Sequence, residues 1–190
     1  ELLIDHAWGY ETCRMSDIKN YHSEEHSLSN GQVLMRNYSF DEALVIVREM
    51  TDNLVLDLFE KGLVTSSLTL WIAYDHRYEH EASKGTVKLE RESNSSKKII
   101  DAVEDLYLRI ADRYTGIRRI EVCANRVAPE SYVQYSLFDD PKQTDKERHL
   151  QEAVLNVKQR YGKNAIMRGS NLLECSTYRE RNEQIGGHRA

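Results

Sequence analysis

The residues of this chain that could bind a ligand are small hydrogen-bond donors and cations, spread over segments in which apolar and polar side chains alternate. Hydroxyls, exposed backbone amides and fixed cations are the groups that bind phosphate. The residues that carry these groups are Ser27, Ser29, Gly31, Thr69, Thr86, Lys88, Arg118 and Arg119. The pattern fits binding to the backbone of a nucleic acid better than it fits catalysis. A solvated sheet face, which commonly carries Thr, Lys and Arg, is the alternative that the pattern leaves open.

Patterns for catalysis or metal binding are weak in comparison. The pairs His22/His26 and His76/His80 have the i, i+4 spacing of metal ligands, but both pairs lie in segments that we expect to be loops, without a third ligand nearby. The cysteines lack Cys-x-x-Cys spacing, and the sequence contains no Gly-rich phosphate loop of the nucleotide-binding kinds. We therefore expect no catalytic residue, metal site or cofactor in this chain.

A second kind of binding site is indicated by the short apolar segment at residues 134–138. Its Leu and Phe precede Asp-Asp-Pro at 139–141, a pattern in which we expect neither the end of a buried strand nor the start of a helix. An extended peptide that inserts its apolar end into a pocket of another protein has this form. The residues that would bind are Gln134, Ser136, Leu137 and Phe138. A linker whose Leu and Phe fold back on the domain is the alternative.

Composition and charge limit the class of protein. At 190 residues, with 40% hydrophobic and 30% charged residues, the chain fits one domain with appendages or two small domains. The net charge of −5 argues against a strongly basic nucleic-acid binder. However, the acidic excess lies in residues 1–75, and the rest of the chain is slightly basic. The placement of individual cations therefore matters more than their total.

Cysteine usage and hydropathy predict a cytoplasmic protein. The three cysteines are widely spaced, which suits free thiols in a reducing compartment. The sequence has no apolar run near the ~20 residues that span a bilayer and no signal peptide, so we expect no membrane contact. The sequence opens on Glu-Leu-Leu without Met, and we expect it to be a fragment of a longer protein.

The apolar spacing predicts an α+β fold built on four strands. Alternating segments place these strands at residues 27–35, 67–74, 85–92 and 117–126. Because each strand has one apolar face, we expect a four-stranded, mostly antiparallel sheet in the order strand, helix, strand, strand, helix, strand. Both helices should cover the same face and leave the other face open. Trp71 on the open face could stack on a base, or could cover the sheet beneath a linker or tail.

Two helices are expected to cover the sheet. The first should begin after Ser39, which forms a capping box with Glu42, and should end just before Gly62. The second should follow Ser95-Ser96, with an apolar stripe that runs from Ile99 to Tyr114 and stops at Gly116.

The two ends of the chain are expected to be simpler. A third amphipathic helix should begin at a capping box formed by Thr144 and Glu147, with an apolar stripe from Leu150 to Tyr161. Residues 163–190 are polar and predict no element, and residues 11–26 are typical of a linker.

The order and spacing of several motifs resemble the C-terminal part of a Y-family translesion DNA polymerase of the UmuC/DinB/ImpB-MucB-SamB type, most like the UmuC-like proteins of Gram-positive bacteria. The motifs are His-Ala-Trp-Gly at 6–9, Ser-Leu-Ser-Asn-Gly-Gln-Val-Leu at 27–34, Ile-Arg-Arg-Ile-Glu-Val at 117–122 and Gln-Tyr-Ser-Leu-Phe at 134–138. The last is similar to the sliding-clamp-binding peptide, usually Gln-Leu-Ser/Asp-Leu-Phe, from which Tyr135 departs at a tolerant position. The tail motifs at 158–163 and 186–188 look like those of the same subgroup.

The resemblance implies a division of the chain into five parts. These are the end of the thumb helix (1–13), an interdomain linker (14–26), the DNA-binding little-finger domain (27–130), a clamp-binding peptide (131–141), and a C-terminal helix with a tail (142–190).

The resemblance also implies partners and contacts. Such a domain holds both backbones of duplex primer-template DNA, and the implied contacts here are Ser27, Ser29, Gly31, Lys88, Arg118 and Arg119. The peptide would bind the bacterial sliding clamp (beta subunit). The palm, with the carboxylates that bind Mg²⁺, would lie N-terminal of this sequence, so nucleotidyl transfer would belong to the parent protein.

An adaptor from a different class is the alternative: a non-polymerase α+β module whose open sheet binds protein or RNA. An RNA reader of this topology would carry stacking aromatic residues on its central strands. Only Trp71 stands at such a position, so the sequence favours the polymerase fragment.

Overall fold

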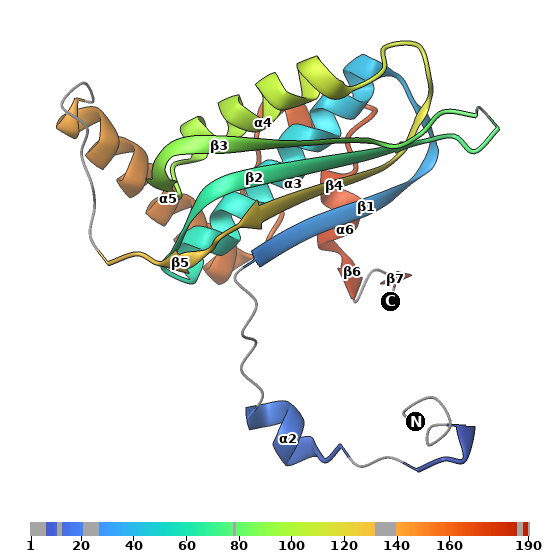
Figure 1. The fold of residues 1–190 in the computed structure, drawn as a ribbon. Helices are drawn as coiled ribbons and strands as arrows, with labels where there is room; N and C mark the ends of the chain where they lie inside the picture. The colour runs from blue at the N-terminus through green and yellow to red at the C-terminus, as the bar shows by residue number, and fades with distance from the viewer. Residues whose placement is uncertain are drawn as a thin grey trace.

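The computed structural model describes residues 7–10, 13–20, 27–77, 79–131, 140–185 and 188–189. The four predicted strands and two predicted helices follow one another in the predicted order (Figure 1). They are β1 (Ser27–Tyr38), α3 (Phe40–Glu60), β2 (Leu63–Tyr74), β3 (Ser83–Ser93), α4 (Ser96–Ile110) and β4 (Ile117–Asn125).

The strands form an antiparallel sheet in the order β1-β4-β2-β3, so β1 and β3 are its edges. A short fifth strand, β5 (Ala128–Pro129), was not predicted. It pairs with Leu63 and Val64, where β2 extends beyond the predicted strand.

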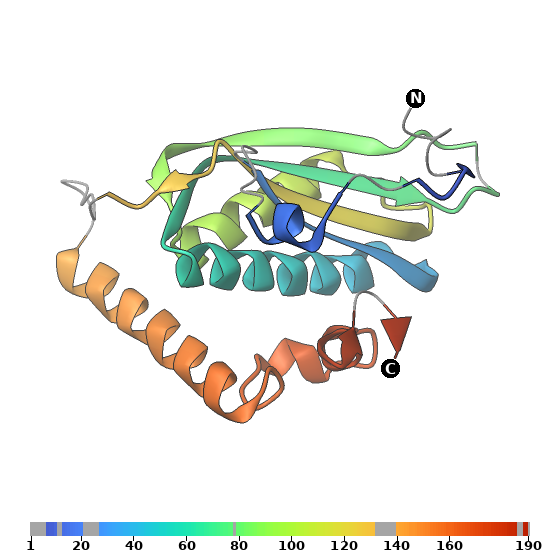
Figure 2. The ribbon, with the colours of Figure 1, turned by 90° about the horizontal axis from the view of Figure 1, so that it is seen from below.

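Helices α3 and α4 cover one face of the sheet, as predicted, and the other face carries no helix in the described part of the chain (Figures 1 and 2). The apolar side chains that alternate along β2 and β4 are fully buried beneath the helices; they include Leu68, Leu70, Ile72, Ile120 and Val122. Burial of such side chains is the main source of stability for a domain of this size. The predicted α+β class is confirmed.

The predicted start and end of α3 are confirmed. The Ser39 hydroxyl accepts a hydrogen bond from the backbone amide of Glu42, and the Glu42 carboxylate accepts one from the amide of Ser39. Gly62 follows the helix with a φ of 61°, in the left-handed region that favours glycine. The capping box and the glycine each depend on residues close together in the sequence, so the sequence alone was enough to predict both helix ends.

The predicted end of α4 was wrong. The helix stops at Ile110, six residues before Gly116, and Tyr114 is 97% exposed instead of continuing the buried stripe. The carboxylate of Asp112 accepts hydrogen bonds from the amides of Tyr114 and Thr115. This local turn competes with the helix and ends it, as Asp side chains commonly do.

The predicted start of the third helix was also wrong. Helix α5 (Pro141–Tyr161) begins three residues before Thr144, because Asp140 is its N-cap and accepts a hydrogen bond from the amide of Lys142 (3.0 Å). Proline suits the first helical position because its missing N–H has no partner there. Asp-Pro therefore begins a helix, contrary to the expectation for residues 139–141. Thr144 and Glu147 do not form a capping box with each other.

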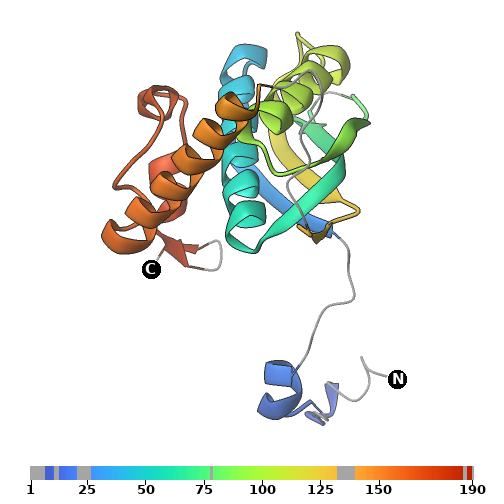
Figure 3. The same cartoon turned by 90° about the vertical axis from the view of Figure 1, so that its left-hand side faces the viewer.

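The C-terminal segment contains elements where none were predicted. They are a 3-10 turn η1 (Gly169–Leu172), α6 (Tyr178–Asn182) and the short paired strands β6 (Gln184–Ile185) and β7 (His188–Arg189). Together with α5 they lie beyond α3 and α4, on the side away from the sheet (Figures 2 and 3). The molecule therefore has three layers, and the open face of the sheet stays free of α5.

The predicted linker contains a short helix, α2 (Met15–Asn20), beginning where the Asp17 carboxylate accepts a hydrogen bond from the amide of Arg14. None of the described helices combines the length and apolar character needed to cross a bilayer. The domain boundaries inferred above stay a prediction.

Candidate nucleic-acid interface

The open face of the sheet is an ordered grid of outward-facing positions, all of them at least partly exposed except Ser67. In strand order β1, β4, β2, β3, successive rows are Ser27–Asn125–Ser67–Lys88, Ser29–Cys123–Thr69–Thr86, and Gly31–Glu121–Trp71–Lys84. A fourth row begins with Val33, Arg119 and Ala73. Seven of the eight predicted contact residues therefore share one face, although they come from all four strands.

A hydrogen-bonded chain crosses the centre of this grid. The Asn125 amide donates to the Thr69 hydroxyl (2.9 Å), and the Thr69 hydroxyl lies 2.9 Å from that of Thr86. Because Thr69 accepts from Asn125, its own proton can go to Thr86, which leaves the Thr86 proton free to donate outward. With this direction of the bond, the network presents a donor on the exposed edge strand β3.

Arg119 lies over the middle of the face. Its guanidinium is 5.0 Å from the centre of the Trp71 ring and 3.4 Å from the Glu121 carboxylate, and its side chain is 49% exposed. The face of the Trp71 ring is therefore in contact with Arg119. Arg119 and Trp71 border a hollow of about 410 Å³ whose lining includes Thr69, Lys84 and Cys123.

The charge of the face is modest. Lys84, Lys88 and Arg119 supply cations, and Glu121 offsets one of them. Lys84 was missed because the strand was predicted to start at 85, although Lys84 stands two residues before Thr86 in the same alternation. Burial raises the pKa of the Cys123 thiol, so this thiol adds no negative charge near neutral pH.

Arg118, the eighth predicted contact, lies elsewhere. The register between β2 and β4 shifts between Ala73 and Tyr74, so Arg118 is an extra residue on β4. Such a bulge re-aims a side chain. Arg118 lines a separate hollow of about 520 Å³ at the end of the sheet, with Arg36, Asn37, Asp75, His76 and Arg77. The sequence pattern did not predict that the adjacent residues Arg118 and Arg119 would lie in different places.

Asp75 organises that second hollow. It is 4% exposed and accepts hydrogen bonds from the Asn37 amide and from both the backbone and the side chain of Arg77. These bonds, chiefly those from the Arg77 side chain, hold the pKa of Asp75 well below its usual range. Arg118 makes no ion pair within the described part of the chain, and the Asp75 carboxylate in the same hollow is paired with Arg77.

The histidine pairs do not come together as ligands where they are described. His76 lies 3.6 Å from Asp75, whereas His80 contacts Asp112 at 3.0 Å and packs at a tilt against the Tyr74 ring. His22 and His26 lie outside the described residues. The predicted clamp-binding residues Gln134, Ser136, Leu137 and Phe138 also lie outside them.

The family model described as the impB/mucB/samB family C-terminal domain matches residues 25–137. The chain belongs to this family. The match begins just before β1 and covers the whole sheet with α3 and α4, so the family domain is the part of the chain that carries the grid and the second hollow. The resemblance inferred from the motifs is confirmed.

Curated relatives of this impB/mucB/samB chain include two proteins named DNA polymerase IV 2. That of Bacillus subtilis (strain 168) is 25% identical over 164 residues, which is 85% of this chain and 39% of the relative. That of Halalkalibacterium halodurans is 21% identical over 168 residues, 88% of this chain and 40% of the relative. The chain thus spans about two-fifths of the length of these relatives.

The solved structures that the chain matches include two from polymerase studies. A complex of the beta-clamp processivity factor with the little finger domain of PolIV gives a TM-score of 0.42 at 12% identity, over 60% of this chain and 100% of that one. A post-insertion binary complex of Dbh DNA polymerase gives a TM-score of 0.40 at 14% identity, over 67% of this chain and 35% of that one.

Proposed function

We propose that this chain is the DNA-binding and clamp-targeting part of an error-prone Y-family translesion DNA polymerase that acts in DNA repair. The observation that carries the proposal is the grid of hydroxyls, a bare glycine and cations on the sheet face that no helix covers in the described part of the chain. Membership of the impB/mucB/samB family supports it. The relatives named DNA polymerase IV 2 support the parent activity, nucleotidyl transfer, which we assign to a palm domain outside this sequence.

The edge strand β1 would supply the contacts of one DNA strand. Ser27 and Ser29 bring hydroxyls, and Gly31 exposes backbone. A Cβ added at Gly31 would meet Glu121 only at 3.6 Å, an ordinary contact, so packing inside the domain does not require glycine there. A bare backbone at this position instead permits close approach of a phosphate.

The opposite edge and the central strands would supply the cations. Lys88 and Lys84 lie on β3, and Arg119 lies between the edges on β4. Arg118 would reach a further phosphate from the second hollow. Because these cations are few, we expect weak binding to duplex DNA that falls steeply with salt, with log Kd changing by roughly 0.9 per log unit of salt for each phosphate neutralised.

Duplex binding tests this proposal. Fluorescence anisotropy with a labelled primer-template should give a Kd that rises with salt, and Arg118→Ala/Arg119→Ala should weaken binding and lower the salt slope by up to about 1.8. Arg109→Ala and Arg113→Ala on the helical side of the domain form the matched control, and should leave the slope unchanged. Equal slopes for the wild type and the Arg118/Arg119 variant would contradict the assignment of the face.

We also propose that residues 134–138 bind the bacterial sliding clamp, on the strength of their sequence pattern. Leu137 and Phe138 would be the apolar anchors, with Gln134 and Ser136 at the pocket rim. Leu137→Ala/Phe138→Ala should abolish binding to immobilised clamp while duplex affinity stays within twofold. Clamp binding that survives this change would remove the anchor role.

An RNA-binding adaptor is the competing function. The central strands β2 and β4 offer Trp71 as their one aromatic side chain on the described open face, and Arg119 already covers its ring. A single-stranded RNA reader needs free aromatic platforms. Competition between duplex DNA and single-stranded RNA in the same anisotropy assay separates the two functions.

A further inference from the structure

The covered side of the edge strand β1 carries polar side chains where apolar ones would be expected. Asn30 and Gln32 alternate with Ser29 and Gly31, so they face the helical layer while their neighbours face the open side. Partly buried amides need hydrogen-bond partners. The Asn30 amide donates to the carbonyl of Met50 (3.3 Å) on α3, which satisfies only part of this need.

The C-terminal segment, residues 163–185, provides the remaining partners. Arg181 on α6 donates to the Asn30 side-chain oxygen (2.6 Å). The Thr177 hydroxyl donates to the side-chain oxygen of Gln32 (3.0 Å). These contacts join residues about 150 positions apart in the sequence. The polar residues of β1 are therefore matched to polar residues of the C-terminal segment.

A buried carboxylate, Glu49, lies beneath the segment, and a half-buried guanidinium, Arg181, belongs to the segment itself. Glu49 on α3 is 3% exposed and accepts a hydrogen bond from the amide of Thr177 (3.3 Å), while its second carboxylate oxygen has no partner in the described part of the chain. Arg181 is close enough to interact with the Glu49 charge. Burial raises the pKa of Glu49 and lowers the pKa of Arg181. The attraction between the two charges opposes both shifts. Loss of Arg181 would leave the Glu49 carboxylate unpaired.

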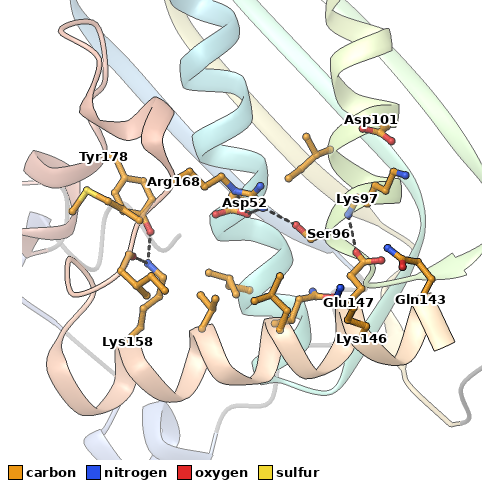
Figure 4. A pocket seen from close by; sticks show the side chains of 17 residues that line it. Asp52, Ser96, Lys97, Asp101, Gln143, Lys146, Glu147, Lys158, Arg168 and Tyr178 are labelled. Carbon is orange, nitrogen blue, oxygen red and sulfur yellow. Dashed lines mark hydrogen bonds and ion pairs between the residues drawn. The ribbon is translucent and has the colours of Figure 1, made fainter.

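Further contacts hold the segment against α3 and α5. Tyr178 is 2% exposed, and Lys158 of α5 donates to its hydroxyl and to the carbonyls of Lys163 and Ile166. Arg168 donates to Asp52 (2.7 Å) and to Ser96 (3.1 Å). Figure 4 shows these anchors around an apolar groove of about 530 Å³ between α5 and the inner helices. The segment is thus fixed at several points along its length.

The segment also reaches the free edge of β1. A hollow of about 390 Å³ is lined by Ser29 and Asn30 of β1 together with Arg181 and Asn182 of α6. Among the described strands β1 pairs only with β4, so its other edge lacks the support that a neighbouring strand gives. The residues that hold the segment are thus next to the residues proposed to contact DNA.

We propose that residues 163–185 are an intramolecular brace that fixes β1 in the conformation that binds the DNA backbone. Thr177 and Arg181 are its positioning residues: they touch Gln32 and Asn30, not the DNA. Without the brace, β1 samples more conformations, and binding must order Ser27, Ser29 and Gly31 at an entropic cost. This inference rests on the proposed DNA-binding function.

Thr177→Ala/Arg181→Ala tests the brace, with Arg179→Ala on the same helix as the matched control. We expect faster amide hydrogen exchange at residues 27–33, with β2 unchanged, and duplex Kd raised about three- to tenfold. The salt slope should equal that of the wild type, because no phosphate contact is removed. Should the double variant fail to fold, Gln32→Ala removes the Thr177 partner alone and should raise exchange and Kd in the same direction.

Each other outcome overturns the brace. Unchanged hydrogen exchange in β1 would mean that the contacts do not hold this strand. Faster exchange with an unchanged Kd would mean that they hold the strand but do not affect DNA binding. A lower Kd would mean that the segment blocks DNA, and a salt slope reduced by about 0.9 would make Arg181 a direct phosphate contact. A wild-type chain that binds no duplex would instead refute the proposed function, whereas the exchange data would still report whether the segment holds β1.

Discussion

At the scale of single residues, Glu42 joins the end of β1 to the start of α3. Its carboxylate accepts two hydrogen bonds from Arg36 (2.7 and 3.0 Å) and one from the amide of Ser39 (2.9 Å). These bonds, chiefly those from Arg36, lower the pKa of Glu42 from 4.5 to about 2. A lowered pKa in the folded state means that the charged form stabilises the fold above pH 4.5 and that this stabilisation is lost as the pH falls toward 2.

Glu42→Gln should therefore destabilise the protein in a pH-dependent way. The amide retains the reciprocal hydrogen bond of the capping box but loses the charge that pairs with Arg36, so we expect a loss of about 1 kcal/mol at pH 7. The difference between the two proteins should shrink as the pH falls from 4.5 to about 2. Thermal unfolding at a series of pH values measures it, and a difference that stays constant over this range would contradict the ion pair.

At the scale of elements, α5 is joined to the domain through the start of α4. Glu147 accepts hydrogen bonds from the Ser95 hydroxyl (2.8 Å) and the amide of Lys97 (2.9 Å), so a side chain of one helix caps the N-terminus of another. Its negative charge also suits the positive end of the helix dipole. Nearby, Arg148 donates to both carboxylate oxygens of Glu130 and lowers its pKa.

Glu147→Ala should thus destabilise the protein, although its side chain was expected to act only within α5. We expect a loss of about 1–2 kcal/mol in the free energy of unfolding, because the amide of Lys97 and the Ser95 hydroxyl lose their acceptor. Glu152→Ala, at an exposed position of the same helix, is the control and should change it by less than about 0.5 kcal/mol. Urea denaturation measures both, and equal effects would contradict the capping role.

These two glutamates show what the sequence could predict. Ser39 and Glu42 are three residues apart, so their capping box follows from local spacing, and alternation placed the core faces of β2 and β4 correctly. Thr144 and Glu147 have the same spacing, but Glu147 accepts its hydrogen bonds from the start of α4. No local sequence pattern predicts this contact. The separation of Arg118 from Arg119 and the docking of residues 163–185 likewise depend on contacts distant in sequence.

At the scale of the whole molecule, the sheet face that we propose binds DNA and the helix that follows the proposed clamp-binding peptide in the sequence lie on different sides. The open sheet face is on one side of α3 and α4, and α5 with the C-terminal segment is on the other (Figures 2 and 3). A duplex on the sheet would therefore leave α5 accessible. Two weak contacts that can form together reinforce each other through effective concentration.

We therefore expect duplex DNA and the sliding clamp to bind at the same time. A primer-template loaded with clamp should bind the chain at least tenfold more tightly than the same DNA alone, and Leu137→Ala/Phe138→Ala should remove the gain while the affinity for free DNA is kept. Surface plasmon resonance with immobilised DNA, with and without clamp, measures this. Competition between clamp and DNA would show that the two sites overlap.

The unexpected start of α5 at Pro141 has a mechanical consequence. Pro129 is tied to Leu63 in the sheet, and Asp140 caps a helix that is hydrogen-bonded to the start of α4. In the sequence, residues 134–138 stand between these two anchored points, and Phe138 is two residues, at most about 7 Å of chain, from the second. A clamp ring bound there would be connected to α5 by very few residues, so we expect a rotation of the ring to be transmitted to the sheet that we propose binds DNA.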